Sequence, residues 1–447
     1  MNQPYGLGAF VVAGLSLVAC VEQSDEQGNE QGNEQGVEQG EDVSEVDQAS
    51  RRGRGNEAVG QGLQNNQPVP NAYGFAATYA SSGALELDTA FSTPQGTNGR
   101  SCDTCHAPEV GWSMTGQRVT QLFNATDGTH PIFANNLDTD RPTADMSTTD
   151  ARWNATTMLR QGKFTRKITL PATRDYDLVG FTDPFGVSTD TTLFFFRRSM
   201  PVANLRSFNV HWDSAMTVGT DLREGLLKQA RANITGAQQG APASEAVVAE
   251  IVDFERQLSH AQVYLWDVGS LTDNGARGGP EYAAAQPLVQ GRFDLYDSWK
   301  NSSNEKRRQI WRGQEVFNNV NAPSGRRCGG CHNAANNGGN VGGALFDIGA
   351  SSPDVARSDM AVFTFKSRVD GQVIRSTDPG AGIRTGSFKD LNKFKVPNLR
   401  GLASRGTYFH GGTADTIEKV VDHYRDELGF QFTSDERDAL VAFLRAL

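Results

Sequence analysis

The chain has 447 residues, with 42 Lys or Arg and 52 Asp or Glu, which gives a formal net charge of −10 at pH 7. This length allows two or three domains with buried cores. No basic patch interrupts the acidic balance, so we expect no nucleic-acid partner.

The amino terminus predicts export. Residues 9–19 form an apolar run that is too short to span a membrane and has the length of a signal-peptide core. The run ends at Leu17-Val18-Ala19-Cys20, which resembles a bacterial lipobox, but Met1–Gly8 contains no Lys or Arg, so a plain signal peptide with an incidental cysteine is the alternative. Residues 1–20 therefore predict a location in the periplasm or otherwise outside the cytoplasm, with a membrane tether if Cys20 carries lipid.

Residues 21–70 form a low-complexity segment in which the tetrad Glu-Gln-Gly-Asn recurs and aromatic residues are absent. Such a segment cannot bury enough apolar surface to offset its ordering entropy, so we expect a disordered linker. Residues 21–60 alone carry a net charge of −8. The acidity of the chain therefore belongs mostly to this linker and says little about the surface that meets a partner.

Two short motifs organise the rest of the chain. Cys102-Asp103-Thr104-Cys105-His106 has two thiols two residues apart, followed at once by an imidazole, and Cys328-Gly329-Gly330-Cys331-His332 repeats the pattern. This is the attachment signature of a c-type haem, in which the cysteines bond the porphyrin edge and the histidine is the proximal iron ligand. A zinc site is the alternative, but paired zinc CxxC motifs normally lie much closer together. We therefore expect two covalent haems, with His106 and His332 on the irons.

The elements between the motifs predict a first haem domain over residues 71–300. Trp112 follows the first motif and is expected on the haem edge. Residues 115–195 are polar with few helical patterns and resemble an extended insertion, which ends in the apolar run Thr191–Phe196. Helices are predicted over 221–232 and 244–264, the second with the apolar stripe Val247, Ile251, Phe254 and Leu258.

A second haem domain is predicted over residues 301–447. A helix over 305–320 precedes the second motif, which is the order found in small cytochrome c domains. A helix over 416–428 follows, and Thr433 with Glu436 forms a capping box that opens a final helix. The expected fold is mainly α, with two cytochrome c-like haem domains, long loops and an extended insertion in the first domain.

The sequence resembles the bacterial di-haem cytochrome c peroxidase and MauG superfamily. Three features carry the resemblance: the two CxxCH motifs, a Trp-Asp between them, and the tail FKVPNLRGLASRGTYFHGGTADTIEKVVDHY. It implies an oxidoreductase that reacts with hydrogen peroxide at the first haem. Electrons would come through the second haem from a small redox protein or a protein substrate, and a calcium ion would lie between the haems.

The resemblance also implies an axial ligand for the second haem. Peroxidases of this family place a Met fourteen residues after the tail histidine, His410, where this chain has Tyr424. MauG proteins have Tyr at the matching place, so Tyr424 is the expected ligand and Met360 the runner-up. The alternative is that Tyr424 belongs to the apolar stripe of its helix. His410 is expected to orient the propionates or the iron ligand.

Trp212 matches the family tryptophan that lies between the two haems, where an indole can relay electrons. The family more often reads Trp-Asp-Gly-Arg, whereas this chain has Trp212-Asp213-Ser214-Ala215. A half-buried aromatic without a redox role is the alternative.

The general acid–base residue that assists O–O cleavage has no obvious match. The family places a Glu about twenty residues after the Trp, and this chain has Ala232 there. Gln238 and Gln239 are the nearest polar candidates, although an amide cannot shuttle a proton at neutral pH. His260 and Glu245 are further candidates from the following helix, and His130, His211 and His423 have no assigned role.

Two functions remain open at this point. The first is the peroxide-reacting enzyme, tilted towards MauG-like oxidation of a protein by Tyr424 and by the missing Glu. The second is a non-enzymatic electron carrier in which Met114, Met146 or Met158 supplies the sixth ligand of the first haem.

Overall fold

The computed structural model describes residues 62–134 and 138–447. The predicted leader, Cys20 and most of the linker lie outside these residues. Residues 62–70, expected at the end of the linker, instead contain strand β1 and most of β2. The helices are α2 (Gly116–Thr126), α3 (Thr149–Ala155), α4 (Leu222–Thr235), α5 (Glu245–Gln257), α6 (Gly279–Ala285), α7 (Glu305–Asn319), α8 (Cys328–Cys331), α9 (Gly382–Thr385), α10 (Ile417–Leu428) and α11 (Ser434–Arg445).

The prediction of a mainly α fold was wrong, because the described residues also form five antiparallel sheets. Their strand orders are β1-β4, β2-β3-β8-β9, β5-β7, β12-β11-β6 and β10-β13. The strands are β1 (Leu63–Gln64), β2 (Val69–Asn71), β3 (Gly74–Ala80), β4 (Ala84–Leu85), β5 (Lys163–Thr169), β6 (Tyr176–Thr182), β7 (Thr192–Arg198), β8 (Leu258–Leu265), β9 (Gly269–Ser270), β10 (Leu345–Phe346), β11 (Val362–Ser367), β12 (Val373–Ser376) and β13 (Phe394–Lys395).

Four of the predicted helices are confirmed, and each begins after a residue whose side chain caps it. The carboxylate of Asp221 accepts a hydrogen bond from the backbone N–H of Glu224 at the start of α4. Both halves of the capping box formed by Thr433 and Glu436 are present at the start of α11. Side-chain caps also open α7 and α10, so the starts of these helices were readable from sequence.

The predicted helix over 244–264 is half wrong. Helix α5 ends at Gln257, and Leu258–Leu265 forms β8. Strand β8 pairs with β3, whose residues lie about 180 positions earlier in the chain. The first five residues of β8 are all buried, so both faces of the strand are covered and the sequence lacks the polar alternation of a surface strand.

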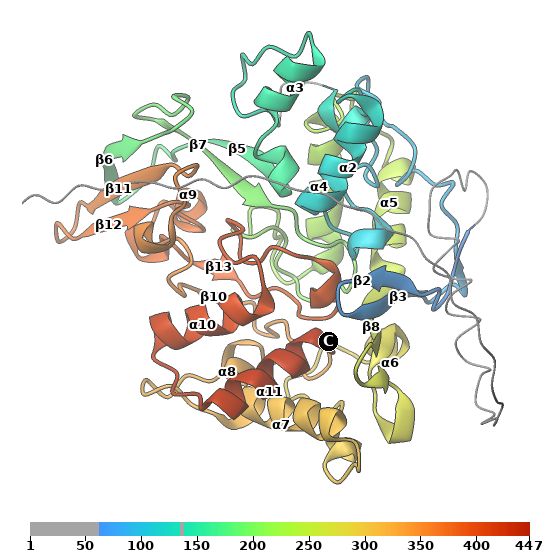
Figure 1. The fold of residues 1–447 in the computed structure, drawn as a ribbon. Helices are drawn as coiled ribbons and strands as arrows, with labels where there is room; N and C mark the ends of the chain where they lie inside the picture. The colour runs from blue at the N-terminus through green and yellow to red at the C-terminus, as the bar shows by residue number, and fades with distance from the viewer. Residues whose placement is uncertain (1–61, 135–137) are drawn as a thin grey trace, which may run out of the picture. The chain divides into compact units, whose positions relative to one another are not determined.

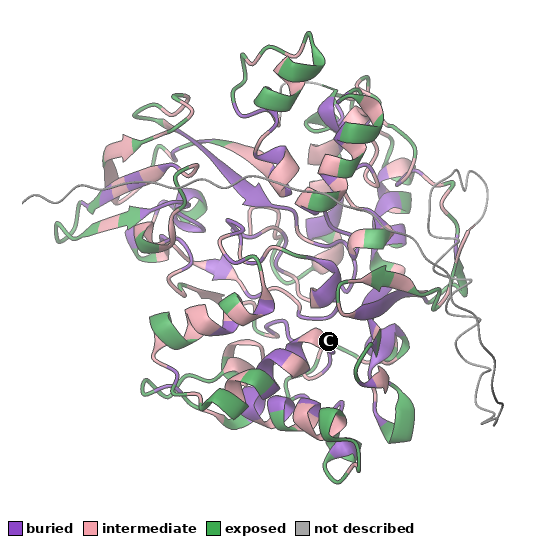
Figure 2. Ribbon diagram, viewed as in Figure 1, coloured by how far each residue is buried: buried purple, intermediate pink, exposed green. Residues whose placement is uncertain are grey.

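The expected insertion contributes to the core. Strand β6 pairs with β11 through six residue pairs from Val362–Thr182 to Ser367–Tyr176. Strands β5 and β7 pair along their whole length, and the run Thr192–Phe196 lies in β7 with four buried residues in succession. In Figure 2 the strand β7 is largely purple, and its neighbours at the edge of the molecule are pink and green.

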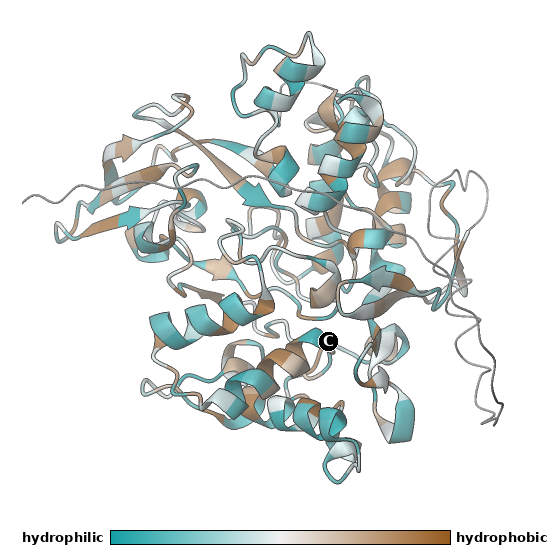
Figure 3. Ribbon diagram, in the orientation of Figure 1, coloured by the Kyte–Doolittle hydropathy of each residue, from teal (hydrophilic) through white to brown (hydrophobic). Residues whose placement is uncertain are grey.

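Two apolar clusters support the two CxxCH segments. One is built on α4 and α5 and includes Trp112, with Cys102 packed against it. The other is built on α7, α10 and α11, with Cys328 packed against it. Helices α7 and α11 cross closely at Gly313, where a Cβ atom would lie 1.9 Å from the carbonyl oxygen of Ala439. Figure 3 shows the brown apolar stripe of α11 beside α7.

Within residues 62–134 and 138–447, no helix has both the length and the apolar character needed to cross a bilayer. The division into domains at residue 300 stays a prediction.

Candidate haem sites

The first CxxCH segment folds into a tight turn that orients His106. The backbone N–H of His106 donates to the carbonyl oxygen of Cys102 at 3.0 Å, and Nδ1 of His106 lies 3.1 Å from the carbonyl oxygen of Trp112. A bond at Nδ1 fixes the ring and leaves Nε2 for an iron. Burial lowers the pKa of His106 to about 4, so the imidazole is neutral, as a metal ligand must be.

The second segment repeats this geometry. Cys328–Cys331 form the short helix α8, and the N–H of His332 donates to the carbonyl oxygen of Cys328 at 2.9 Å. Nδ1 of His332 lies 2.5 Å from the carbonyl oxygen of Gly338. Burial again lowers the histidine pKa to about 4. Two stretches of unrelated flanking sequence thus reach the same arrangement of two thiols and one oriented imidazole.

Zinc fits neither segment. The described part of the chain holds no group of three or more His, Cys, Asp or Glu side chains arranged to bind a metal ion, and none of the four motif cysteines forms a disulfide. The calcium ion implied by the resemblance would be held largely by backbone oxygens, and it stays a prediction.

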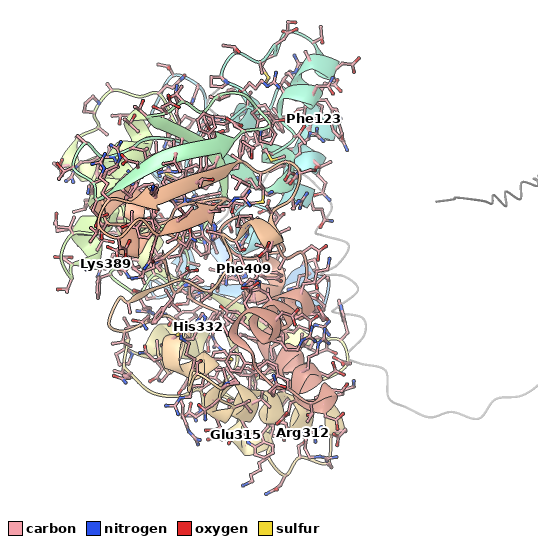
Figure 4. All side chains as sticks on the ribbon, turned by 90° about the vertical axis from the view of Figure 1, so that its left-hand side faces the viewer. Phe123, Arg312, Glu315, His332, Lys389 and Phe409 are labelled. Carbon is pink, nitrogen blue, oxygen red and sulfur yellow. The ribbon has the colours of Figure 1, made fainter. Side chains whose placement is uncertain are left out.

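Each CxxCH segment lines a large cavity. The first encloses about 1450 Å³ and the second about 1510 Å³, and both are partly open to solvent. Figure 4 labels His332 and Phe409, both of which line the second cavity.

Trp212 lines both cavities, together with Pro201 and Lys395. Its side chain is 7% exposed, and its indole N–H donates to the carbonyl oxygen of Arg198 at 2.9 Å. Its ring centroid lies 6.3 Å from that of His410. Trp212 therefore lies where the two cavities meet, and its role between two cofactors stays a prediction.

Two buried and two half-buried cations around the cavities fit the propionate carboxylates of a haem. Arg198, Arg405 and Lys395 line the second cavity and Arg166 the first, and none of the four has an ion pair among the described residues. Burial lowers the pKa of Arg166 and Arg198 to about 10, of Arg405 to about 9 and of Lys395 to about 8. The Nε atoms of Arg166 and Arg198 also lack hydrogen-bond partners. Buried charges of this kind need anionic partners, and carboxylates suit guanidinium groups well.

A buried ionic network lies directly behind Trp212. Arg197 donates to both carboxylate oxygens of Asp378, at 2.6 and 2.8 Å, and pairs with Asp213 at 2.8 Å. Burial would lower the pKa of Arg197, but the two carboxylates outweigh this effect and raise it. Burial would raise the pKa of Asp213, but the guanidinium groups of Arg197 and Arg384 hold it well below its usual range.

His410 connects this network to the second cavity. Its ring stacks on Phe394 with centroids 3.8 Å apart, and its Nε2 lies 3.1 Å from Oγ of Ser351 and 3.8 Å from a carboxylate oxygen of Asp378. Burial lowers its pKa to about 4, so the imidazole is neutral at pH 7. His410 lines the second cavity and does not line the first.

Tyr424 projects from α10 into the second cavity, where His332 also lies. Burial raises the pKa of its phenol, and the nearby thiols of Cys328 and Cys331 raise it further. Its role as an iron ligand stays a prediction. Met360, the runner-up, is not among the residues that line this cavity.

The candidates for acid–base chemistry differ in whether they line the first cavity. Gln238 lines the first cavity, and its Oε1 accepts a hydrogen bond from the backbone N–H of Gln95 at 2.8 Å. Glu245 lies at the surface, paired with Arg231. His260 is buried between hydroxyls of Thr78 and Ser404, outside both cavities. Ala232 does not line the first cavity.

Sequence reasoning missed Glu255 of the first cavity and gave His211 no role. Glu255 of α5 is 2% exposed, and its Oε2 has no hydrogen-bond partner. His211 precedes Trp212, and burial lowers its pKa to about 3. Glu255 was recognisable as the one acid that interrupts the apolar face of its helix, four residues after Ile251.

Of the methionines proposed as sixth ligands of the first haem, Met114 lines the first cavity, and Met146 and Met158 do not.

Two CxxCH segments that each line a cavity are the arrangement expected of a c-type haem protein. No family model matches the chain. A segment of 137 residues is 33% identical to the cytochrome c551 peroxidase of Nitrosomonas europaea, covering 30% of this chain and 34% of that protein. A segment of 65 residues is 40% identical to cytochrome-c peroxidase IdrP2 of Denitromonas iodatirespirans, covering 13% and 18% of the two chains. The chain is a distant homologue of cytochrome c peroxidases, and it spans about a third or less of the length of these relatives.

Among solved structures, the chain is similar to a MauG-like protein associated with microbial copper homeostasis. The TM-score is 0.35 at 17% identity, over 56% of this chain and 73% of that one.

Proposed function

We propose that the chain is a di-haem c-type oxidoreductase that reacts with hydrogen peroxide at the first haem. It draws electrons through the second haem from a small redox protein or from a protein substrate. One observation supports the proposal beyond the partial homology: Trp212 lines both cavities, so its indole lies where it could carry electrons from one cofactor to the other. The expected location is the periplasm, with a possible lipid tether at Cys20.

Each haem would be held by residues of known placement. Cys102 and Cys105 bond the first haem and His106 binds its iron, and Cys328, Cys331 and His332 do the same for the second. When bound, each haem supplies an iron that can change its oxidation state. Four cations without an ion pair among the described residues would hold the propionates: the buried Arg198 and Arg405 and the half-buried Arg166 and Lys395.

The two cavities are suited to different tasks. In the second, Tyr424 is available as an anionic oxygen ligand, which stabilises oxidised iron. In the first, Gln238 offers an amide that can hold a peroxide by hydrogen bonds, and His211 lies beside it as a neutral imidazole whose lowered pKa disfavours protonation. We therefore assign peroxide binding to the first cavity and electron delivery to the second.

Trp212 is the electron relay in this scheme. Its indole N–H is held by the carbonyl oxygen of Arg198, and Asp213 is fixed by Arg197, so the ring cannot reorient freely. A ring with a fixed position can be oxidised and reduced with little structural change. His410, beside the ring, is a positioning residue for the second haem.

Two residues favour oxidation of a partner protein over rapid turnover of a cytochrome donor. They are Tyr424 and Ala232, which stands where the family has a Glu. An electron carrier without enzymatic activity is the second candidate. The observation that favours it is Met114, which lines the first cavity and carries a thioether that can serve as the sixth ligand of the iron.

Stoichiometric peroxide addition, followed optically with and without a reduced small cytochrome c, tests the proposal. Rapid oxidation of the cytochrome supports a peroxidase, and a long-lived oxidised state of both haems supports MauG-like oxidation of a protein. Oxidised protein that shows only low-spin haem by electron paramagnetic resonance, unchanged by peroxide, would leave the electron carrier as the answer.

A further inference from the structure

The helices that close the two cavities can be compared position by position when both are counted from their N-terminal caps. Helix α5 begins after the cap Ser244, and α11 begins after the cap Thr433. Counted from these caps, Phe254 corresponds to Phe443, and Ile251 corresponds to Leu440. Each helix therefore presents its cavity with an apolar residue and the residue four positions later, one turn along the same face.

That later residue differs in kind between the cavities. In α11 it is Leu444, and in α5 it is Glu255. Leu444 is 7% exposed and Glu255 is 2% exposed, so the carboxyl is at least as deeply buried as the leucine that it replaces. Burying a carboxyl where a leucine fits costs free energy unless the group is paired or protonated.

Glu255 is not paired. Its side chain has no hydrogen bond and no ion pair among the residues that the structure describes, and its Oε2 is fully enclosed without a partner. Burial raises its pKa to about 8. Its charge in turn raises the pKa of Cys102, which places the carboxyl next to an attachment point of the first haem.

The other charged and titratable groups near Glu255 come from α4, from the attachment loop and from the rest of the cavity lining. Helix α4, which packs against α5, contributes Gln229 and Asn233 to the cavity, and its Lys228 and Arg231 lie at the surface. The attachment loop contributes Asp103 beside Cys102. The other charged or titratable groups that line the cavity are Cys105, Arg100 with its partner Asp138, Arg166, Arg197, Lys395, His106 and His211.

We propose that Glu255 takes up a proton when the first haem gains an electron, so that the first cavity couples electron arrival to proton uptake and the second does not. The proposal rests on the proposed function, since it needs a redox-active haem in each cavity. The balance is one electron from the protein donor and one proton from solvent. The oxidised haem becomes reduced, and the carboxylate of Glu255 becomes a carboxylic acid.

The sign of the effect follows from charge. A carboxylate beside the haem disfavours the added electron, and the added electron disfavours the carboxylate, so the pKa of Glu255 is higher in the reduced protein. Between its pKa values in the two states, the equilibrium for reduction of the first haem falls tenfold per pH unit. For a one-electron couple this is about 59 mV per pH unit.

The test is a spectroelectrochemical titration of the haem-loaded protein from about pH 5 to about pH 10, a range that spans the normal carboxyl pKa and the raised one. The two haems are followed separately by their electron paramagnetic resonance signals. The expected result is a pH-dependent potential at the first haem, abolished in Glu255→Gln and in Glu255→Leu. Glu245→Gln, which removes an exposed carboxylate of the same helix, keeps it. The infrared difference between reduced and oxidised protein should show a carboxylic-acid carbonyl band that Glu255→Gln lacks.

Lys395 provides the discriminating comparison, because it lines both cavities and burial lowers its pKa to about 8. A pH dependence that appears equally at both haems and disappears in Lys395→Met would overturn the proposal, as would a slope that survives Glu255→Gln. Peroxide consumption is measured on the same samples. A protein that reacts with peroxide but shows no slope refutes the role of Glu255 and leaves the proposed function standing.

Discussion

Replacing Arg197 with Met removes the centre of the buried ionic network behind Trp212. The side chains of Arg197 and Asp378 are each 2% exposed, and that of Asp213 is 0% exposed. Among the residues that the structure describes, the guanidinium of Arg197 is the one group that forms ion pairs with both carboxylates. After the replacement, Asp213 keeps its pair with Arg384 at 3.1 Å, whereas Asp378 keeps the N–H of Gly380 and the neutral His410.

The expected loss of unfolding free energy is large. Removing one partner of a buried pair costs about 3–5 kcal/mol, because an uncompensated charge stays in the interior. Arg197 compensates two carboxylates, so we expect the upper part of this range at pH 7. Met has a similar volume and an apolar stem, so the loss of packing is a minor part of the effect.

The loss of unfolding free energy in Arg197→Met should depend on pH. Its direction follows from the lowered pKa values of Asp213 and Asp378. In the native protein the pKa values of Asp213 and Asp378 are lowered, so their stabilising effect is present above the unfolded-state pKa near 3.9 and is lost as the pH falls through the folded-state pKa. Without Arg197, burial dominates at Asp378 and raises its pKa. A protonated Asp378 is buried at little cost, so the difference between variant and wild type should shrink at acid pH.

Urea unfolding of the haem-loaded proteins, followed by circular dichroism at pH 7 and at about pH 4, measures both effects. Arg231→Ala is the matched control, because Arg231 forms an exposed pair with Glu245 that should contribute nothing measurable. If Arg197→Met is no less stable than Arg231→Ala at pH 7, or if its penalty grows as the pH falls, the reasoning about this network is refuted.

Two further predictions concern the cofactors. Tyr424→Phe should change the optical and electron paramagnetic resonance spectra of the second haem only. Tyr408→Phe, which removes another phenol from the same cavity whose hydroxyl donates to the carbonyl oxygen of Leu402, should not change them, and an unaltered spectrum in Tyr424→Phe would remove the ligand assignment. The double replacement of Cys328 and Cys331 with Ala should halve the covalent haem stain on denaturing gels, and an unchanged stain would contradict attachment at the second motif.

The parts of the fold that could be predicted from the sequence have local causes. The capping box at Thr433 and the cap at Asp221 satisfy backbone groups within one turn, so residues a few positions apart reveal them. The turn of each CxxCH segment is local in the same way, since the N–H of His106 bonds to Cys102 four residues earlier.

The parts that failed depend on distant partners. Leu258–Leu265 continues the apolar pattern of α5 and becomes a strand because β3 lies beside it. Strand β6 likewise depends on a distant partner, because it pairs with β11 much later in the chain. Local pattern cannot distinguish a buried strand from a buried helix, because both present continuous apolar residues.

The site shows the same division. The motif residues and Trp212 were predicted from their spacing and from resemblance, and the structure places each of them at a cavity. The unpaired cations Arg166, Arg198 and Lys395 come from three separate segments, and nothing in their sequence neighbours marks them as cavity-lining. Glu255 was visible as an acid on an apolar face, but its isolation from any partner depends on α4 and on the first haem loop.

The relay through Trp212 is the central claim, and freeze-quenched electron paramagnetic resonance after one equivalent of peroxide tests it most directly. In the wild-type protein, peroxide added at the first haem should change the signals of both haems. In Trp212→Phe the first haem should still respond, and the response of the second should slow by more than about tenfold, or about 1.4 kcal/mol in the barrier. Equal responses of the second haem in the two proteins would contradict the claim.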